Sequence, residues 1–452
     1  MGARQNGVDG AIALLLALSR HNGRAALSVL MAECGLARAS LHRIALTLEA
    51  AGLVRRERGW LSLGPAAAAF APGPAAQHWM GLEARPVRSI VAERGSQGLY
   101  AGPIVLSPPP VRRASGRFRI GFSNASMANP WRVALVHSVE FAVSRLGGAV
   151  HRLTVKHAGD DGAQQARDID AMVAQGVDGL LVSAAAPDAM VPALERAMAA
   201  GIAVVLVDRG VAAAAPHTSF VNTDDRAIGQ VTALWLAERL KGKGRILLLA
   251  GEPEAEPAQD RLAAARAVFA GFPELDLLPV AWTRWLRETG RDVVREHLRA
   301  GTSIDGVWCD SGLQGVGSLQ AFIESGVSRG KIPPHTGGDL NLAYKLAIRH
   351  GVPLAAMDSP PAMGRRAVEV LFAAMLGQWV PSRVDVSSAV VLTKGAATRS
   401  VKADIWAEDH VRWDLPDDLV LHSGLGDAYN PRSFRIHYAG NSYNRSAARR
   451  VS

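Results

Sequence analysis

The stretch AGIAVVLVDR, residues 200–209, indicates the fold of most of the chain. It is a continuous apolar run that ends in two charged residues, Asp208 and Arg209. Such a run, rich in valine and other aliphatic residues, is typical of a strand buried on both faces of a parallel sheet. Ligands bind beyond the carboxyl ends of such strands, so Asp208 and Arg209 lie where a ligand is expected.

Similar apolar runs recur on both sides of this stretch and alternate with segments of helical pattern. We expect strands at residues 118–122, 150–155, 179–183, 203–208, 246–250, 277–282, 306–310 and 354–357. Between them we expect helices at residues 131–146, 163–175, 188–200, 225–240, 258–270, 291–298 and 313–325. This alternation predicts an α/β fold with parallel sheets covered by helices on both faces. Eight strands favour two α/β lobes over one.

Composition excludes several classes of protein. The chain has 452 residues, of which 48% are hydrophobic and 20% are charged, so it is neither disordered nor collagen-like. Its two cysteines, Cys34 and Cys309, exclude a disulfide framework and a cysteine-rich zinc site. The longest apolar run, residues 11–18, is too short to span a membrane and lacks the basic flank and cleavage site of a signal peptide.

The net charge of +9 is concentrated near the N-terminus. Residues 1–117 contain 14 arginines, no lysine and six acidic residues, which gives +8. Residues 118–395 contain 28 basic and 28 acidic residues. Arginine is suited to bidentate contacts with phosphate and guanine, so the sequence predicts a small nucleic-acid-binding domain joined to a neutral body.

Residues 1–64 follow the order of a winged helix-turn-helix. Helices are expected at 8–20, 27–33 and 37–50, with Gly35 in the turn between the last two because it tolerates positive φ. Residues 53–63 alternate like a hairpin with arginines at its tip. The alternative is a plain three-helix bundle with a solvated charged face.

Three stretches of this segment carry a family resemblance: GLARASLHR at 35–43, LEAAGLV at 48–54 and Leu63-Gly64. Through them the segment resembles the DNA-binding domain of the IclR family of bacterial regulators. It implies that the third helix enters the major groove and that the hairpin lies along the neighbouring backbone or minor groove. The implied DNA-binding residues are Arg38, Ser40, His42, Arg43, Arg55, Arg56 and Arg58. Singly, Arg43 is also compatible with a surface ion pair and His42 with a solvated or capping role.

Proline- and arginine-rich residues 65–117 are expected to form a linker, and the IclR pattern does not continue there. The body is expected to span residues 118–395 and a C-terminal extension residues 396–452. The extension is rich in aromatic residues, so we expect part of it to pack on the body or on a second subunit.

Six stretches of the body carry a family resemblance: NPW at 129–131, QGVDG at 175–179, AGIAVVLVDR at 200–209, VNTD at 221–224, LKGKG at 240–244 and GD at 338–339. Through them the body resembles the periplasmic ribose-binding-protein family, a type I sugar-binding fold that recurs as the effector domain of LacI-type repressors. The resemblance places in the cleft Asn129, Trp131, Asp208, Arg209, Arg261, Trp285, Asp310, Ser311, Asp339 and Asp358. The alternative is that these charged residues form interlobe ion pairs or cap helices.

This chain departs from the family pattern at three places. Arg132 stands where a second aromatic residue is usual, Asp310-Ser311 replaces a usual amide–acid pair, and Asp358 stands where an amide is common. The cleft is therefore more charged than is typical. Aspartates accept hydrogen bonds from neighbouring hydroxyls, arginines donate to oxygens and indoles stack on C–H faces, so a sugar or sugar derivative is the expected ligand.

The sequence thus predicts a cytoplasmic, sugar-responsive transcriptional regulator that binds double-stranded operator DNA as a homodimer, without membrane attachment. One alternative is an exported sugar-binding receptor of an ABC transporter. Another is an enzyme acting on a phosphorylated sugar, but the sequence holds no nucleophile elbow, zinc helix or phosphate loop. We therefore expect no catalytic residue, cofactor or metal.

Overall fold

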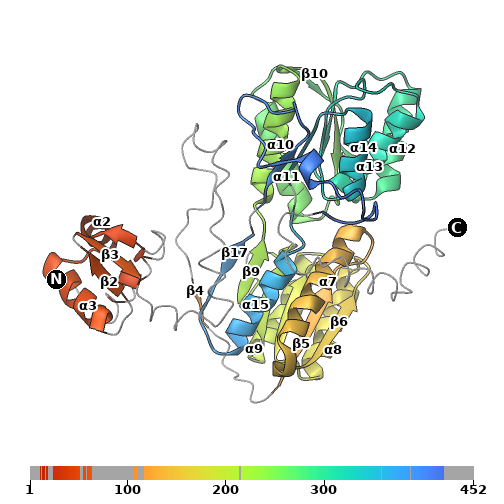
Figure 1. Ribbon diagram of the computed structural model, residues 1–452. Helices are drawn as coiled ribbons and strands as arrows, with labels where there is room; N and C mark the ends of the chain where they lie inside the picture. The colour runs from red at the N-terminus through yellow and green to blue at the C-terminus, as the bar shows by residue number, and fades with distance from the viewer. Residues whose placement is uncertain are drawn as a thin grey trace. The chain divides into compact units, whose positions relative to one another are not determined.

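The computed structural model describes residues 11, 13–15, 17–18, 24–50, 54–57, 59–63, 106–108, 117–212, 215–357, 359–386 and 388–421 (Figure 1). They fall into two units. Unit 1 lies within Met1–Pro86 and unit 2 lies within Val87–Ser452.

Unit 1 is a winged helix-turn-helix, as the sequence predicts. Its helix α2 (Leu27–Cys34) ends at Gly35, whose φ of 60° makes the turn into α3 (Arg38–Ala50). The predicted first helix is helical at the residues described, 11, 13–15, 17 and 18. The hairpin is antiparallel, and its two strands are β2 (Val54–Glu57) and β3 (Trp60–Leu63).

A third strand of unit 1 has no clear sequence signal. β1 (Arg24–Ala26) pairs antiparallel with β3, which gives the order β1-β3-β2. Three residues are too few to produce an alternating pattern, so this strand exists through its pairing with the hairpin. The helices and the sheet enclose a core of Leu14, Leu18, Leu30, Leu41, Ala45, Leu48, Val54 and Leu61.

The N-terminal lobe of unit 2 is built on a six-stranded sheet in which every neighbouring pair is parallel, in the order β17-β9-β8-β7-β5-β6. Its strands are β5 (Phe118–Asn124), β6 (Val150–His157), β7 (Gly179–Ser183), β8 (Ala203–Val207), β9 (Ser219–Asn222) and β17 (Arg383–Asp385). Two helices, α7 (Pro130–Arg145) and α15 (Met363–Met375), pack together over one face, and α8 (Gly162–Ala174) packs with α9 (Val191–Ala199) over the other (Figure 1).

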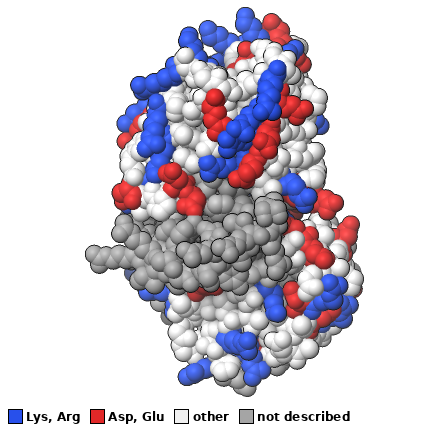
Figure 2. Space-filling model, turned by 90° about the vertical axis from the view of Figure 1, so that its right-hand side faces the viewer, with Lys and Arg blue, Asp and Glu red and all other residues white. Residues whose placement is uncertain are grey.

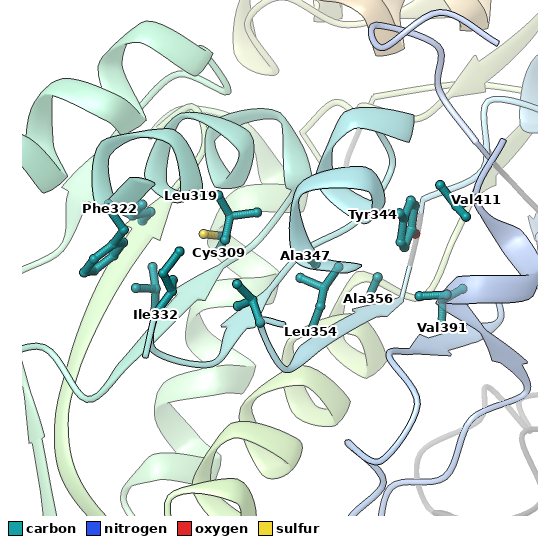
Figure 3. Close-up of a cluster of buried hydrophobic side chains, with 14 of the residues drawn as sticks. Cys309, Leu319, Phe322, Ile332, Tyr344, Ala347, Leu354, Ala356, Val391 and Val411 are labelled. Carbon is teal, nitrogen blue, oxygen red and sulfur yellow. The ribbon is translucent and has the colours of Figure 1, made fainter. Parts of the chain in front are cut away.

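The C-terminal lobe holds an eight-stranded sheet in the order β11-β10-β13-β14-β15-β18-β19, with β12 also paired to β10. Its strands are β10 (Lys243–Ala250), β11 (Glu274–Leu277), β12 (Ala281–Trp282), β13 (Gly306–Cys309), β14 (His335–Thr336), β15 (Leu354–Met357), β18 (Val390–Leu392) and β19 (Ile405–Trp406). Its helices are α10 (Asp225–Arg239), α11 (Glu256–Phe269), α12 (Arg287–Arg299), α13 (Gly312–Glu324), α14 (Asn341–His350) and α16 (Ala407–His410). Figure 3 shows part of its core, where Phe322, Tyr344 and Leu354 lie in one buried layer.

One predicted strand is wrong. Residues 277–282 form the end of β11 and, after a break, the two residues of β12, both paired in parallel with β10. Pro279 lies in the break, and proline has no N–H to continue a ladder.

Segments from the predicted linker and extension belong to unit 2. Strand β4 (Leu106–Ser107) pairs antiparallel with β16 (Val380–Pro381). Residues 396–421 cover the C-terminal lobe and contribute β19, α16 and buried side chains such as Val401 and Leu419. The backbone N–H of Leu421 donates to the carbonyl of Asp339, 2.6 Å away. The extension therefore packs on the body up to residue 421, and its later aromatic residues lie outside the described residues.

Candidate functional site

A cavity that is partly open to solvent lies between the two lobes of unit 2. The N-terminal lobe supplies Asn129, Trp131, Arg132 and Asp208. The rest of the lining is Pro257, Arg261, Trp285, Ser311, Leu313, Asp339 and Ser359. Seven of the ten predicted ligand residues are among these. They converge because most of them follow the carboxyl ends of parallel strands.

Three residues of the cavity wall hold a left-handed backbone that only glycine adopts freely. The φ angles are 65° at Asp208, 55° at Trp285 and 65° at Asp339. Such conformations cost on the order of 1–3 kcal/mol each and persist where the surroundings enforce them, commonly at ligand sites. Their grouping around one cavity supports a binding role for this wall.

Asp208 is paired with Arg132 in the floor of the cavity. The Nη2 atom of Arg132 lies 2.8 Å from Oδ2 of Asp208, and its Nη1 donates to Oγ of Ser183 at 2.9 Å. Burial and repulsion by Arg209 lower the pKa of Arg132 to about 10, so it remains charged at neutral pH. Arg132 also lies 5.3 Å from the centre of the Trp131 ring. The residue that replaces the usual aromatic side chain thus neutralises the aspartate.

Arg261 is held from behind by two elements of the C-terminal lobe. Its Nε donates to Oδ1 of Asp225 at 2.7 Å, and its Nη1 donates to the carbonyl of Asp310 at 3.1 Å. Burial works to lower the pKa of Arg261, but attraction to the neighbouring carboxylates outweighs it and raises that pKa. Burial also raises the pKa of Asp225 to about 6, against the attraction of Arg261. The guanidinium of Arg261 is therefore oriented before any ligand binds.

Asp310 lies behind the wall and orients Trp285 instead of lining the cavity. Its Oδ1 accepts a hydrogen bond from Nε1 of Trp285 at 3.1 Å, and its Oδ2 accepts one from the N–H of Gly251 at 2.9 Å. Burial raises the pKa of Asp310 to about 6. A Cβ added at Gly251 would lie only 2.0 Å from Cε2 of Trp285. Glycine at this position makes room for the indole.

Arg209 is also outside the cavity lining and joins the two lobes at its edge. It comes from the N-terminal lobe, pairs with Asp160 at 3.0 Å and lies 5.5 Å from the centre of the Trp285 ring. Trp285 belongs to the C-terminal lobe, so this contact spans the cleft.

The remaining predicted ligand residues are fixed by local contacts. Asn129 caps α7 by accepting a hydrogen bond from the N–H of Arg132. Trp131 donates from Nε1 to the carbonyl of Ser359 at 2.7 Å. Ser311 donates to Oδ2 of Asp339 at 2.7 Å, while burial raises the pKa of Asp339.

Asp358 lies outside the described residues. Sequence reasoning did not select Arg132, Pro257, Leu313 and Ser359 as lining residues. Helix capping and ion pairing were the alternative roles for the predicted ligand residues. Asn129 caps a helix and Asp208 forms an ion pair, and both also line the cavity.

The predicted DNA-binding residues of unit 1 are only partly on one face. Arg38, His42 and Arg43 are exposed on α3, whereas Ser40 is half-buried. Arg55 is exposed on β2, and Arg58 lies outside the described residues.

Arg56 is also exposed on β2 and has a partner within unit 1. It forms an ion pair with Glu49 on α3, and its backbone N–H donates to Oε1 of Glu49 at 3.2 Å. The hydrogen bond from Arg56 lowers the pKa of Glu49. Arg56 thus ties the hairpin to the third helix.

Unit 2 presents a different surface. On the face shown in Figure 2, basic and acidic side chains are interspersed over the described residues. Unit 2 also contains surface ion pairs, such as that of Arg291 with Glu324 at 2.7 Å. Mixed charge of this kind does not suit the phosphate backbone of DNA.

Comparison with known families agrees with these two architectures. The periplasmic binding protein domain matches residues 120–378, and the IclR helix-turn-helix domain matches residues 7–58. The chain belongs to the periplasmic binding protein family. It carries an IclR-type helix-turn-helix domain ahead of the ligand-binding fold.

Proteins similar to unit 2 include ribose-, xylitol- and fructose-binding proteins. The ribose import binding protein RbsB of Bacillus subtilis (strain 168) is 26% identical over 226 residues, which are 49% of this chain and 72% of that protein. The xylitol-binding protein of Mycolicibacterium smegmatis is 30% identical over 171 residues, 37% of this chain and about half, 48%, of that protein. The solved fructose-binding periplasmic domain of a hybrid two-component system is 27% identical, with a TM-score of 0.55 over 62% of this chain and 92% of that domain.

Two further structural findings bear on function. Within the described ranges, no group of three or more histidine, cysteine, aspartate or glutamate side chains is arranged to hold a metal ion. Among the same residues, no helix is both long and apolar enough to cross a membrane.

Proposed function

We propose that this protein is a transcriptional regulator that binds operator DNA through unit 1 and a sugar or sugar derivative through the cleft of unit 2. The observation that carries the proposal is the presence in one chain of a helix-turn-helix with exposed Arg38 and Arg43 and of a preorganised cavity between two lobes. The proposal includes a cytoplasmic location, where operator DNA lies. It also includes a homodimer, in which two helix-turn-helix units read the two halves of a palindrome.

The chemistry of the cavity supports a polyhydroxylated ligand. Asp208 and Asp339 accept hydrogen bonds from hydroxyls, Arg261 donates to ligand oxygens, and the indoles of Trp131 and Trp285 offer flat apolar surfaces to C–H faces. The lining contains two arginines and two aspartates, so its formal charge is balanced. The proposed ligand residues are the ten predicted ones together with Arg132. Within this set, Arg209 and Asp310 do not line the cavity but contact Trp285 and hold its ring in place.

An exported sugar-binding receptor is the second candidate, because the relatives of unit 2 include transport receptors. The IclR-type domain at residues 7–58 favours the regulator. A receptor that works outside the cytoplasm has no use for a DNA-reading helix. Fractionation of cells that express the full chain separates the two, since a receptor would be recovered outside the cytoplasm.

Arg43→Ala tests whether the two functions reside in separate units. We expect this variant to bind a selected operator about 10- to 100-fold more weakly, because a bidentate arginine contact contributes roughly 1–3 kcal/mol. Gel shifts measure this loss. The rise in melting temperature caused by a stabilising sugar, found in a thermal-shift screen of aldoses, ketoses and alditols, should be unchanged.

Arg152→Ala is the matched control, because Arg152 is exposed on β6 of unit 2. It should leave both measurements at the wild-type value. Equal DNA affinity of wild type and Arg43→Ala would contradict the proposed role of α3. A screen in which no sugar raises the melting temperature would contradict the proposed role of the cleft.

A further inference from the structure

Helix α3 exposes one continuous stripe to solvent. Ala39, His42, Arg43 and Leu46 are all exposed and follow the spacing i, i+3, i+4, i+7. The opposite side of the helix is buried in the core of unit 1 through Leu41, Ala45 and Leu48. A recognition helix lying in a major groove presents side chains to successive base pairs with this spacing.

Leu46 is unusual within this stripe because it is a large apolar side chain that is 44% exposed. Its neighbours one turn earlier, His42 and Arg43, are polar or charged and suit a nucleic-acid surface. Among the described residues of unit 1, the core holds other leucines of the same helix and does not include Leu46.

The major groove offers a specific partner for such a side chain. Thymine carries a C5-methyl group at the floor of the groove, and apolar protein groups contact it. The arginine beside Leu46 makes the surrounding stripe attractive to phosphates and to guanine, which brings the apolar group against the DNA. A second copy of the chain is a less suitable occupant, because pairing two such stripes would bring Arg43 close to its own copy.

We propose that Leu46 is a specificity-determining residue that reads a thymine methyl group in each half-site of the operator. This inference rests on the proposed function, since it requires unit 1 to bind DNA. It adds to that function a base preference that the polar residues of α3 do not supply. Leu46 discriminates thymine from cytosine and from uracil by the methyl group alone.

The test begins with selection of binding sites from random duplex DNA by the full-length wild type and by Leu46→Ala. We expect the wild type to select a palindrome with one thymine position per half-site that Leu46→Ala no longer distinguishes. Replacing both of these thymines with deoxyuridine removes only the two methyl groups. This should weaken wild-type binding about tenfold and change the affinity of Leu46→Ala less than twofold.

Two variants serve as controls. Leu46→Met keeps a flexible apolar side chain and should retain most of the deoxyuridine effect. Val29→Ala removes another exposed apolar side chain of unit 1, on α2, and should keep the wild-type site and the wild-type deoxyuridine effect. Far-ultraviolet circular dichroism shows whether each variant is folded.

The outcomes are distinct. The inference is overturned if Leu46→Ala selects the same site with the same deoxyuridine penalty. It is also overturned if Leu46→Ala weakens all sequences equally and changes the oligomeric state, because Leu46 would then contact protein. Failure of the wild type to select any sequence would instead overturn the proposed function, and this inference with it.

Discussion

Replacement of Asp208 by alanine is expected to lower the free energy of unfolding of unit 2 by about 3–5 kcal/mol, because it leaves a buried charge without its partner. The side chains of Arg132 and Asp208 are only 4% and 8% exposed, and they are 2.8 Å apart. Ser183 remains as a neutral hydrogen-bond partner of the guanidinium, but it does not balance the charge. Urea unfolding followed by circular dichroism measures the loss.

An exposed ion pair of the same lobe provides the matched control. Asp170 pairs with Arg196 at 2.8 Å, with side chains 42% and 54% exposed, so Asp170→Ala should cost at most about 1 kcal/mol. The double variant Asp208→Ala with Arg132→Met should recover much of the stability, since it removes both charges. Equal losses for Asp208→Ala and Asp170→Ala would contradict the buried pair as described.

Gly312→Ala is expected to be the most damaging exchange of a single hydrogen for a methyl group near the cleft. A Cβ at this position would lie 1.4 Å from the carbonyl oxygen of Gly338, which is a backbone atom and not the end of a flexible side chain. The start of α13 must then separate from the loop that carries Asp339, which breaks the Ser311–Asp339 hydrogen bond. We expect a loss of about 3 kcal/mol in unfolding free energy and loss of sugar-induced stabilisation.

Gly148→Ala is the control for this variant, because a Cβ there would meet no atom within 4 Å. Its melting temperature should stay at or slightly above the wild-type value. If Gly312→Ala melts at the wild-type temperature and still responds to sugar, the close approach of α13 to the Asp339 loop is not as described.

The sequence predicts the regular parts of the fold well for a physical reason. Strands β7 and β15 have the predicted bounds because each is a continuous apolar run buried between two layers of helices. Strands β14 and β17 lack any such pattern, since they are only two and three residues long and Val384 is their one apolar residue. They are strands only because neighbouring strands of the same sheet pair with them.

The candidate site also has residues that the sequence predicts and contacts that it does not. Residues at the ends of strands, such as Asp208 and Ser311, are predictable because parallel topology brings those ends together. The partners that fix them are not, because Arg132 lies on α7 whereas Asp208 follows β8, and Arg56 on β2 pairs with Glu49 on α3. The spacing of residues along the chain does not indicate these contacts. The sequence therefore did not predict that Asp310 lies behind Trp285 or that Arg56 pairs with Glu49 on α3.

The most direct test of the account is the affinity of the full-length protein for its selected operator with and without the sugar that raises its melting temperature. A ligand shifts the balance between two forms only by its differential affinity for them, and 100-fold selectivity corresponds to about 2.7 kcal/mol. We predict at least a tenfold change in operator affinity at saturating sugar, which Arg261→Ala abolishes. The same operator affinity with and without a sugar that demonstrably binds would contradict the claim that the cleft controls the DNA-reading unit.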